Sequence, residues 1–232
     1  MASRWQADPM TAILLALTSH DDLGGLRPTG FYVPEAAHPW RIFRSAGFDV
    51  DLVSVAGGRP PIDGLDDGDA TQVQFLDAMA DRLASTPRST DVDAVGYDAI
   101  LFVGGHGAMW DFPDDAALAR LGRDIYEAGG VVAAVCHGPA ALVNLTLSDG
   151  SHLVDGREVS AFTNAEEEAV GLTGAVPFLL QTALEERGAK HVGAENFTSQ
   201  VSSAQRLVTG QNPASAVGVA EEVVRLLSTV HR

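Results

Sequence analysis

The pattern of apolar and polar positions along the chain predicts alternating strands and helices. Strands buried on both faces are expected from the apolar runs at 12–17, 131–135 and 97–103, the last interrupted by Asp98, and 49–55 alternates like a further strand. Stretches with helical spacing lie between these runs. This alternation predicts an α/β fold, a flavodoxin-like doubly wound and mainly parallel sheet sandwiched by helices.

The helices are expected where apolar residues recur at intervals of three and four positions. These stretches are 34–46, 72–83, 114–128, 165–171, 176–187 and 214–230, the last with Asn212 as its cap and Pro213 in its first turn. Further strands are expected at 158–162, 194–202 and 206–209, and a long loop at 56–70. Because no linker-like stretch rich in Pro, Gly and Ser interrupts the pattern, we expect one domain over 1–232.

The strand at 131–135 runs directly into Cys136-His137-Gly138-Pro139, and Pro139 suits the first turn of a helix. A sharp strand-to-helix corner of this kind is a nucleophile elbow, which lifts a side chain into a cleft. The amides that open the expected helix would lower the pKa of the Cys136 thiol. Cys136 is therefore a candidate nucleophile, and the alternative is a small buried core residue.

Charge and cysteine content narrow the classes of function. The formal net charge of −16 disfavours nucleic-acid binding, which needs clustered Lys and Arg. A single cysteine excludes an internal disulfide framework and suits a reducing compartment. The opening MASRWQADPM lacks the apolar core of an export signal, and the run 12–17 is too short to span a membrane, so we expect a cytoplasmic protein without membrane association.

Glycines and histidines elsewhere give weaker signals. Gly104-Gly105-His106-Gly107 follows the strand 97–103 and matches no nucleotide-binding fingerprint, so a second corner that contributes an amide to the cleft is expected. No close pair of histidines with ligand spacing occurs, and we predict no metal. A calcium loop is disfavoured against a solvated loop for the acidic positions Asp63, Asp66, Asp67 and Asp69.

Seven segments together resemble one known family. They are TSHDDLG, TGFYVPEAAHPW, AGGRPPIDG, FVGGHGAMWDFPDD, GGVVAAVCHGPAAL, AFTNAEEEAVGL and LVTGQNPASA. In order and spacing these segments are similar to the ThiJ/PfpI superfamily, also described as class I glutamine amidotransferase-like, and most of all to its glyoxalase III and heat-shock-chaperone branch. The resemblance covers nearly the whole chain.

The resemblance implies a set of catalytic residues. Cys136 matches the nucleophile, His137 the adjacent histidine, and Glu35 a helix-borne carboxylate that hydrogen-bonds the thiol. The backbone amides of Gly105 and His137 match an oxyanion hole.

A further carboxylate that orients the histidine maps best to Glu167, although Glu166 and Glu168 flank it and one sequence leaves the register open. We also expect His106 and Trp110 in the substrate pocket, although aromatic residues here suit the core or a dimer face equally.

A thiolate in this setting suits attack on the aldehyde carbon of a 2-oxoaldehyde such as methylglyoxal, followed by proton transfer and release of a 2-hydroxy acid, D-lactate in the family. This chemistry needs no cofactor. The alternatives are a cysteine peptidase, amidase or protein deglycase of the same superfamily, and a holding chaperone or redox-sensing stress protein. A small aldehyde substrate and a homodimer are the partners that we expect.

Overall fold

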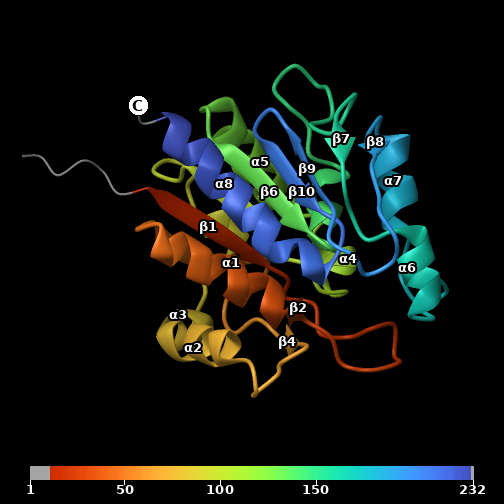
Figure 1. Ribbon diagram of the computed structural model, residues 1–232, viewed down its shortest axis with the longest axis horizontal. Coiled ribbons are helices and arrows are strands. Elements are labelled where there is room, and N and C mark those ends of the chain that lie inside the picture. Colours follow the sequence, from red (N-terminus) through yellow and green to blue (C-terminus); the bar gives the residue numbers. More distant parts are fainter. Residues whose placement is uncertain (1–10, 231–232) are drawn as a thin grey trace, which may run out of the picture.

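The computed structural model describes residues 11–230 and contains a central sheet of six strands (Figure 1). Its order is β3 (Asp49–Ser54), β1 (Ala12–Leu17), β5 (Ala99–Phe102), β6 (Val131–Val135), β10 (Leu207–Gly210) and β9 (Val201–Ala204). The first five strands run parallel and β9 pairs antiparallel at one edge. The predicted α/β fold with a mainly parallel sheet is confirmed. The opening MASRWQADPM, from which we expected no export signal, lies outside the described residues.

Helices cover both faces of this sheet, and alternate side chains of each strand point to opposite sides. On one face Ile13, Leu15 and Leu17 of β1 are buried with α1 (Val33–Ser45), α2 (Ala70–Ala78), α3 (Ala80–Ala84) and α8 (Ala216–Val230). On the other face Leu14 and Ala16 are buried with α4 (Ala108–Asp111), α5 (Ala116–Glu127) and α7 (Leu180–Glu186). Figure 1 shows α1 and α8 side by side across the sheet, where they pack on each other.

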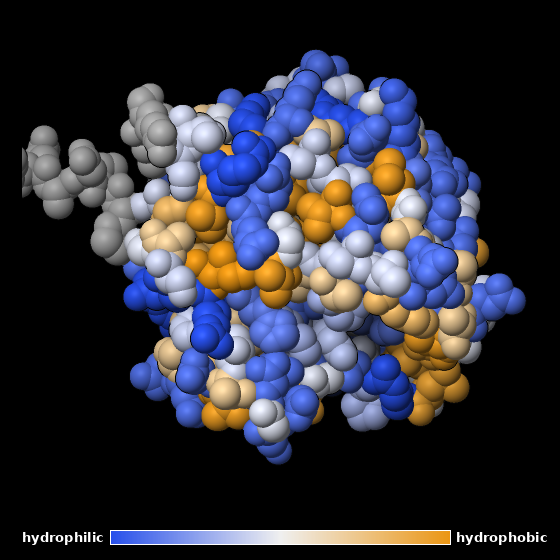
Figure 2. Space-filling view, viewed as in Figure 1, coloured by the Kyte–Doolittle hydropathy of each residue, from blue (hydrophilic) through white to orange (hydrophobic). Residues whose placement is uncertain are grey.

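Smaller elements complete the fold. The remaining elements are the strand pair β2 (Phe31–Tyr32) and β4 (Ile62–Asp63), the pair β7 (Glu158–Val159) and β8 (Lys190–His191), helix α6 (Asn164–Ala169), and the 3-10 helices η1 (Ser89–Asp91), η2 (Gly138–Leu142) and η3 (Pro213–Ser215). Among residues 11–230, the helices are too short or too polar to cross a bilayer. Figure 2 shows a largely hydrophilic face with smaller groups of apolar residues between the polar ones.

Several expected features differ from the structure. The helix expected at 72–83 is divided at Met79, whose φ of −103° and ψ of 9° leave the helical region. The helix expected at 176–187 begins only at Leu180. The strand expected at 194–202 is irregular before Val201. Asn212 makes no side-chain cap: its Oδ1 accepts from the Ser215 hydroxyl and from no helix amide, while its Nδ2 donates to Glu166 and to the Thr198 carbonyl.

Candidate active site

Cys136 stands at a sharp corner between β6 and η2. Its φ is +60°, a left-handed conformation that side-chain-bearing residues seldom adopt. Two backbone hydrogen bonds hold this conformation: the Cys136 amide donates to the Gly210 carbonyl at 2.9 Å, and the Cys136 carbonyl accepts from the Phe162 amide at 3.0 Å. The strained backbone and its position at the end of a parallel strand are those of a nucleophile elbow.

The segment after this corner differs from the expected helix. It is the five-residue 3-10 helix η2, and a Cβ on Gly138 would lie 2.1 Å from the Phe102 carbonyl oxygen, so the turn packs directly on β5. The predicted lowering of the thiol pKa is also wrong in direction. Burial, followed by the nearby Glu35, raises the pKa of Cys136 well above its usual value, and the opposing effect of the His137 amide is smaller.

His137 and Glu167 extend from Cys136 as a chain of polar contacts. The Cys136 Sγ lies 3.4 Å from His137 Nδ1, and His137 Nε2 lies 2.9 Å from Glu167 Oε2. Because the carboxylate can only accept, the proton of this imidazole is placed on Nε2, which leaves Nδ1 facing the thiol with a lone pair. The structure thus brings Glu167 to His137, whereas Glu168 is exposed.

Both members of this contact have shifted pKa values. Burial, with a smaller contribution from the neighbouring His106, lowers the pKa of His137 to about 4. Burial raises the pKa of Glu167, but the hydrogen bonds from His106 and His137 outweigh it and bring the pKa to about 2. At neutral pH the pair is therefore a neutral imidazole held by a carboxylate.

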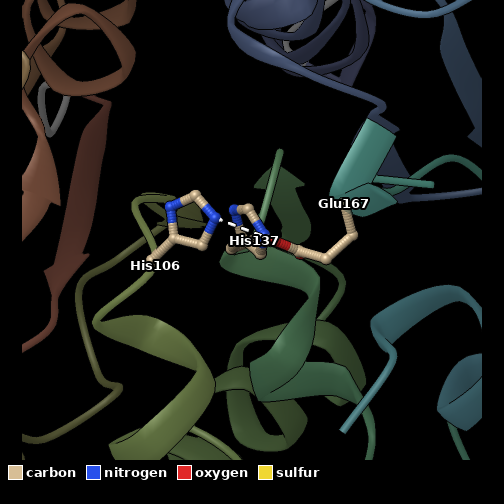
Figure 3. Close-up of side chains that lie close together, drawn as sticks. All are labelled: His106, His137 and Glu167. Atoms are coloured by element: carbon tan, nitrogen blue, oxygen red, sulfur yellow. Dashed lines mark hydrogen bonds and ion pairs between the residues drawn. The ribbon is translucent and has the colours of Figure 1, made fainter. Parts of the chain in front are cut away.

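His106 approaches the same carboxylate from the loop after β5. Its Nε2 lies 3.1 Å from Glu167 Oε1, and its ring centre lies 4.1 Å from that of His137. Figure 3 shows the two rings beside each other, with Glu167 reaching them from α6. His106, His137 and Glu167 together form a cluster that could hold a metal ion. The spacing of residues in the sequence did not indicate this cluster, because its members come from three separate segments of the fold.

Glu35 approaches Cys136 from the first turn of α1. Its side chain is fully buried, and among the described residues neither carboxyl oxygen has a well-formed hydrogen bond. Burial raises its pKa to about 8, and weaker interactions with the Cys136 thiol and the Gly104 amide oppose this shift. Gly104 leaves the space that the carboxyl needs, because a Cβ there would lie 2.3 Å from Glu35 Oε2.

The remaining predicted site residues lie at the adjacent corner or beyond it. Gly105 has a φ of +108°, and a Cβ there would lie 2.3 Å from the Gly30 carbonyl oxygen, so glycine is required. The oxyanion role of the Gly105 and His137 amides stays a prediction. Trp110 stacks on His20 with ring centres 4.9 Å apart, and its role in a substrate pocket also stays a prediction.

Glu166 is a buried residue that sequence reasoning did not assign. Its Oε2 accepts from the Thr163 amide at 2.9 Å, and its Oε1 accepts from the Phe197 amide at 2.7 Å and from Asn212 Nδ2 at 2.8 Å. These bonds fasten the start of α6, and with it Glu167, to two other segments. The capping-box pattern of Thr163 with a glutamate three residues later was the available signal.

The chain resembles known proteins over most of its length. The DJ-1/PfpI family matches residues 26–226. The glutathione-independent glyoxalase HSP31 of Saccharomyces cerevisiae is 35% identical over 220 residues, which cover 88% of this chain and 92% of that protein.

Two crystal structures superpose closely. Rapid Encystment Protein 24 kDa of Francisella tularensis has a TM-score of 0.90 and 38% identity over 94% of this chain and 99% of its own. Glyoxalase III of Candida albicans has a TM-score of 0.86 and 31% identity over 94% of this chain and 98% of its own.

The doubly wound sheet with a strained cysteine corner defines an α/β protein of the nucleophile-elbow class. Within that class, the family match over residues 26–226 and the 35% sequence identity to HSP31 show that the chain belongs to the DJ-1/PfpI family.

Proposed function

We propose that this protein is a glutathione-independent glyoxalase that converts methylglyoxal or a related 2-oxoaldehyde to a 2-hydroxy acid, D-lactate from methylglyoxal. In this proposal Cys136 is the nucleophile and the reaction is of the lyase type. The relatives from Saccharomyces cerevisiae and Candida albicans carry the name glyoxalase, which supports the assignment of substrate class.

The observation that carries the proposal is the fully buried carboxyl of Glu35 beside a buried thiol, with no well-formed hydrogen bond among the described residues. Such burial disfavours the charged form, and it keeps the carboxyl group protonated near neutral pH. A protonated carboxyl can donate a proton to a substrate oxygen or carbon and take it back. His137 supplies a base on the other side of the same sulfur.

The reaction begins when the Cys136 sulfur attacks the aldehyde carbon and the thiol proton passes to His137 Nδ1. The product of this step is a hemithioacetal, whose oxygen is stabilised by the amides of Gly105 and His137. The C–H proton of that carbon then moves to the neighbouring carbonyl carbon through an enediol, with Glu35 exchanging protons at the substrate. This transfer leaves a thioester, and water releases the 2-hydroxy acid and the free thiol.

The enclosure of the site favours a small substrate over a peptide. Cys136 is 5% exposed and His137 1%, whereas a peptidase needs a nucleophile that an extended chain can reach. A three-carbon aldehyde needs far less access. The buried histidine and carboxylates also exclude bulk water from the enediol, which limits side reactions.

The test is lactate formation from methylglyoxal by the purified protein without glutathione. We expect steady turnover to D-lactate on chiral analysis and loss of turnover in Cys136→Ala. The matched control is Ser203→Ala, which removes an exposed hydroxyl on β9. Absence of turnover in the wild type, or turnover that survives in Cys136→Ala, would contradict the proposal.

A further inference from the structure

Three ligand atoms converge beside the candidate nucleophile. One ring nitrogen each of His106 and His137 and a carboxylate oxygen of Glu167 all lie within 4.8 Å of one another (Figure 3). Both histidines point to the same carboxylate, at 3.1 Å and 2.9 Å. The side chains of His137 and Glu167 are almost fully buried, and 15% of the His106 side chain is exposed, so the cluster has a solvent-facing side through His106.

Two imidazole nitrogens and one carboxylate oxygen form a ligand set that suits zinc and leaves a fourth position open. Zinc binds such atoms at about 2.0–2.2 Å, which places tetrahedral ligands roughly 3.4 Å apart. The two contacts to Glu167 are already close to that separation, so a small outward movement of the side chains would admit the ion. The buried carboxylate would compensate part of the ion's charge.

We infer that His106, His137 and Glu167 form an inhibitory site for a divalent transition metal of the zinc type. Binding replaces the two hydrogen bonds to Glu167 with metal–ligand bonds. The His137 Nε2 must then present its lone pair to the metal, so the imidazole proton moves to Nδ1. Since Nδ1 faces the Cys136 sulfur at 3.4 Å, the histidine can no longer accept the thiol proton.

The metal site rests on geometry alone, whereas its inhibitory effect rests on the proposed function. The sulfur and the metal face different nitrogens of the imidazole ring, because the sulfur contacts Nδ1 and the metal takes Nε2. The metal therefore binds without coordination by sulfur. The proposed site therefore differs from one in which the Cys136 thiol itself binds the zinc ion.

Cobalt(II) titration tests the site. We expect saturable binding of one ion per chain, visible ligand-field bands, and no near-ultraviolet sulfur-to-cobalt band. Cys136→Ser should keep these bands, whereas His106→Gln and Glu167→Gln should each weaken binding at least tenfold, with folding verified by circular dichroism. Absence of saturable binding, a sulfur-to-cobalt band, or binding unchanged in both ligand variants would overturn the site.

The inhibition is measured on the metal-free wild type with methylglyoxal. Stoichiometric zinc should abolish turnover, and a chelator should restore it fully. Full turnover with zinc bound would overturn the inhibition and leave the site standing. A metal-free protein without turnover would contradict the proposed function, whereas the site is judged separately by the cobalt spectrum.

Discussion

Two buried carboxylates flank the Cys136–His137 pair, and they differ in what surrounds them. Glu167 receives hydrogen bonds from two histidines, and these lower its pKa to about 2 against the effect of burial. Glu35 is more deeply buried and has no well-formed hydrogen bond among the described residues, so its pKa rises to about 8. Near neutral pH one is an ion and the other an acid.

The comparison shows that burial alone does not decide the charge of a carboxyl group. Hydrogen-bond donors decide the charge, because a buried ionised carboxylate is tolerated only where hydrogen bonds replace those to water. This site uses both outcomes: the ionised Glu167 holds the imidazole in one tautomer, and the protonated Glu35 is available for proton exchange with a substrate.

The largest expected effect follows Glu35→Gln. Glutamine keeps the size and lacks the exchangeable acid, so turnover of methylglyoxal should fall by about 10²–10⁴-fold, the usual contribution of a general acid–base group. Glu167→Gln should also reduce turnover, by a different mechanism, because an amide donor at this position turns the imidazole proton of His137 toward the sulfur. Steady-state kinetics of both variants check this. Unchanged kcat in Glu35→Gln would remove its catalytic role.

Stability should respond to the two substitutions in opposite directions. Glu35 has a pKa of about 8 in the folded protein and about 4.3 when unfolded, so stability falls as pH rises between these values, by about 1.4 kcal/mol per pH unit. Glu35→Gln lacks this loss, so its stability relative to the wild type should increase as the pH rises to about 8. Denaturant unfolding at several pH values measures the difference, and a difference constant with pH would contradict the raised pKa.

Glu167 gives the opposite dependence. Its pKa of about 2 lies below the unfolded value, so its contribution is present above about pH 4.3 and is lost as pH falls toward 2. Glu167→Gln should therefore be less stable than the wild type at neutral pH, by roughly 1–3 kcal/mol for the hydrogen bonds lost. The same unfolding series includes this variant, and equal stability at pH 7 would contradict the account.

The pH dependence of turnover should reflect the protonation of Glu35. Because the protonated form of Glu35 exchanges the proton, kcat/KM should fall above about pH 8, tenfold per pH unit. The residual activity of Glu35→Gln should lack this alkaline decline. An identical decline in the variant would assign the alkaline loss of activity to a group other than Glu35.

The smallest effect is expected at Glu166, which holds the segment that carries Glu167. In Glu166→Gln the side chain keeps one acceptor oxygen for four neighbouring donors, so stability should fall by about 1–2 kcal/mol and turnover only a few-fold. The exposed Glu168→Gln is the matched control and should change neither. A loss of turnover as large as that in Glu167→Gln would place Glu166 in the chemistry itself.

The sequence predicted the parts of this molecule that local chemistry determines. The bounds predicted for the strands at 12–17 and 131–135 were exact, because their residues are apolar on both faces. The corner at Cys136 followed from a strand that ends at Val135, with Gly138-Pro139 shortly after it. Met79 interrupts a helix whose apolar spacing continues across it, so tertiary packing decided that boundary. The direction of the thiol pKa was wrong because burial among β6, α1 and Phe162 cannot be measured from a short segment.

The site was harder to predict where it depends on register or long-range contact. Three consecutive glutamates leave open which one faces the histidine, and only the helical turn of α6 directs Glu167 inward and Glu168 to solvent. The approach of His106 to the same carboxylate joins residues 61 positions apart. The residue identities carried no sign of that contact.

The central claim is that the two carboxyl groups differ in protonation at neutral pH. Infrared spectroscopy of the wild type at pH 7, with Glu35→Gln and Glu167→Gln measured beside it, tests this most directly. We predict a protonated-carboxyl C=O band that disappears in Glu35→Gln and remains in Glu167→Gln. A band that persists in Glu35→Gln, or disappears only in Glu167→Gln, would contradict the account.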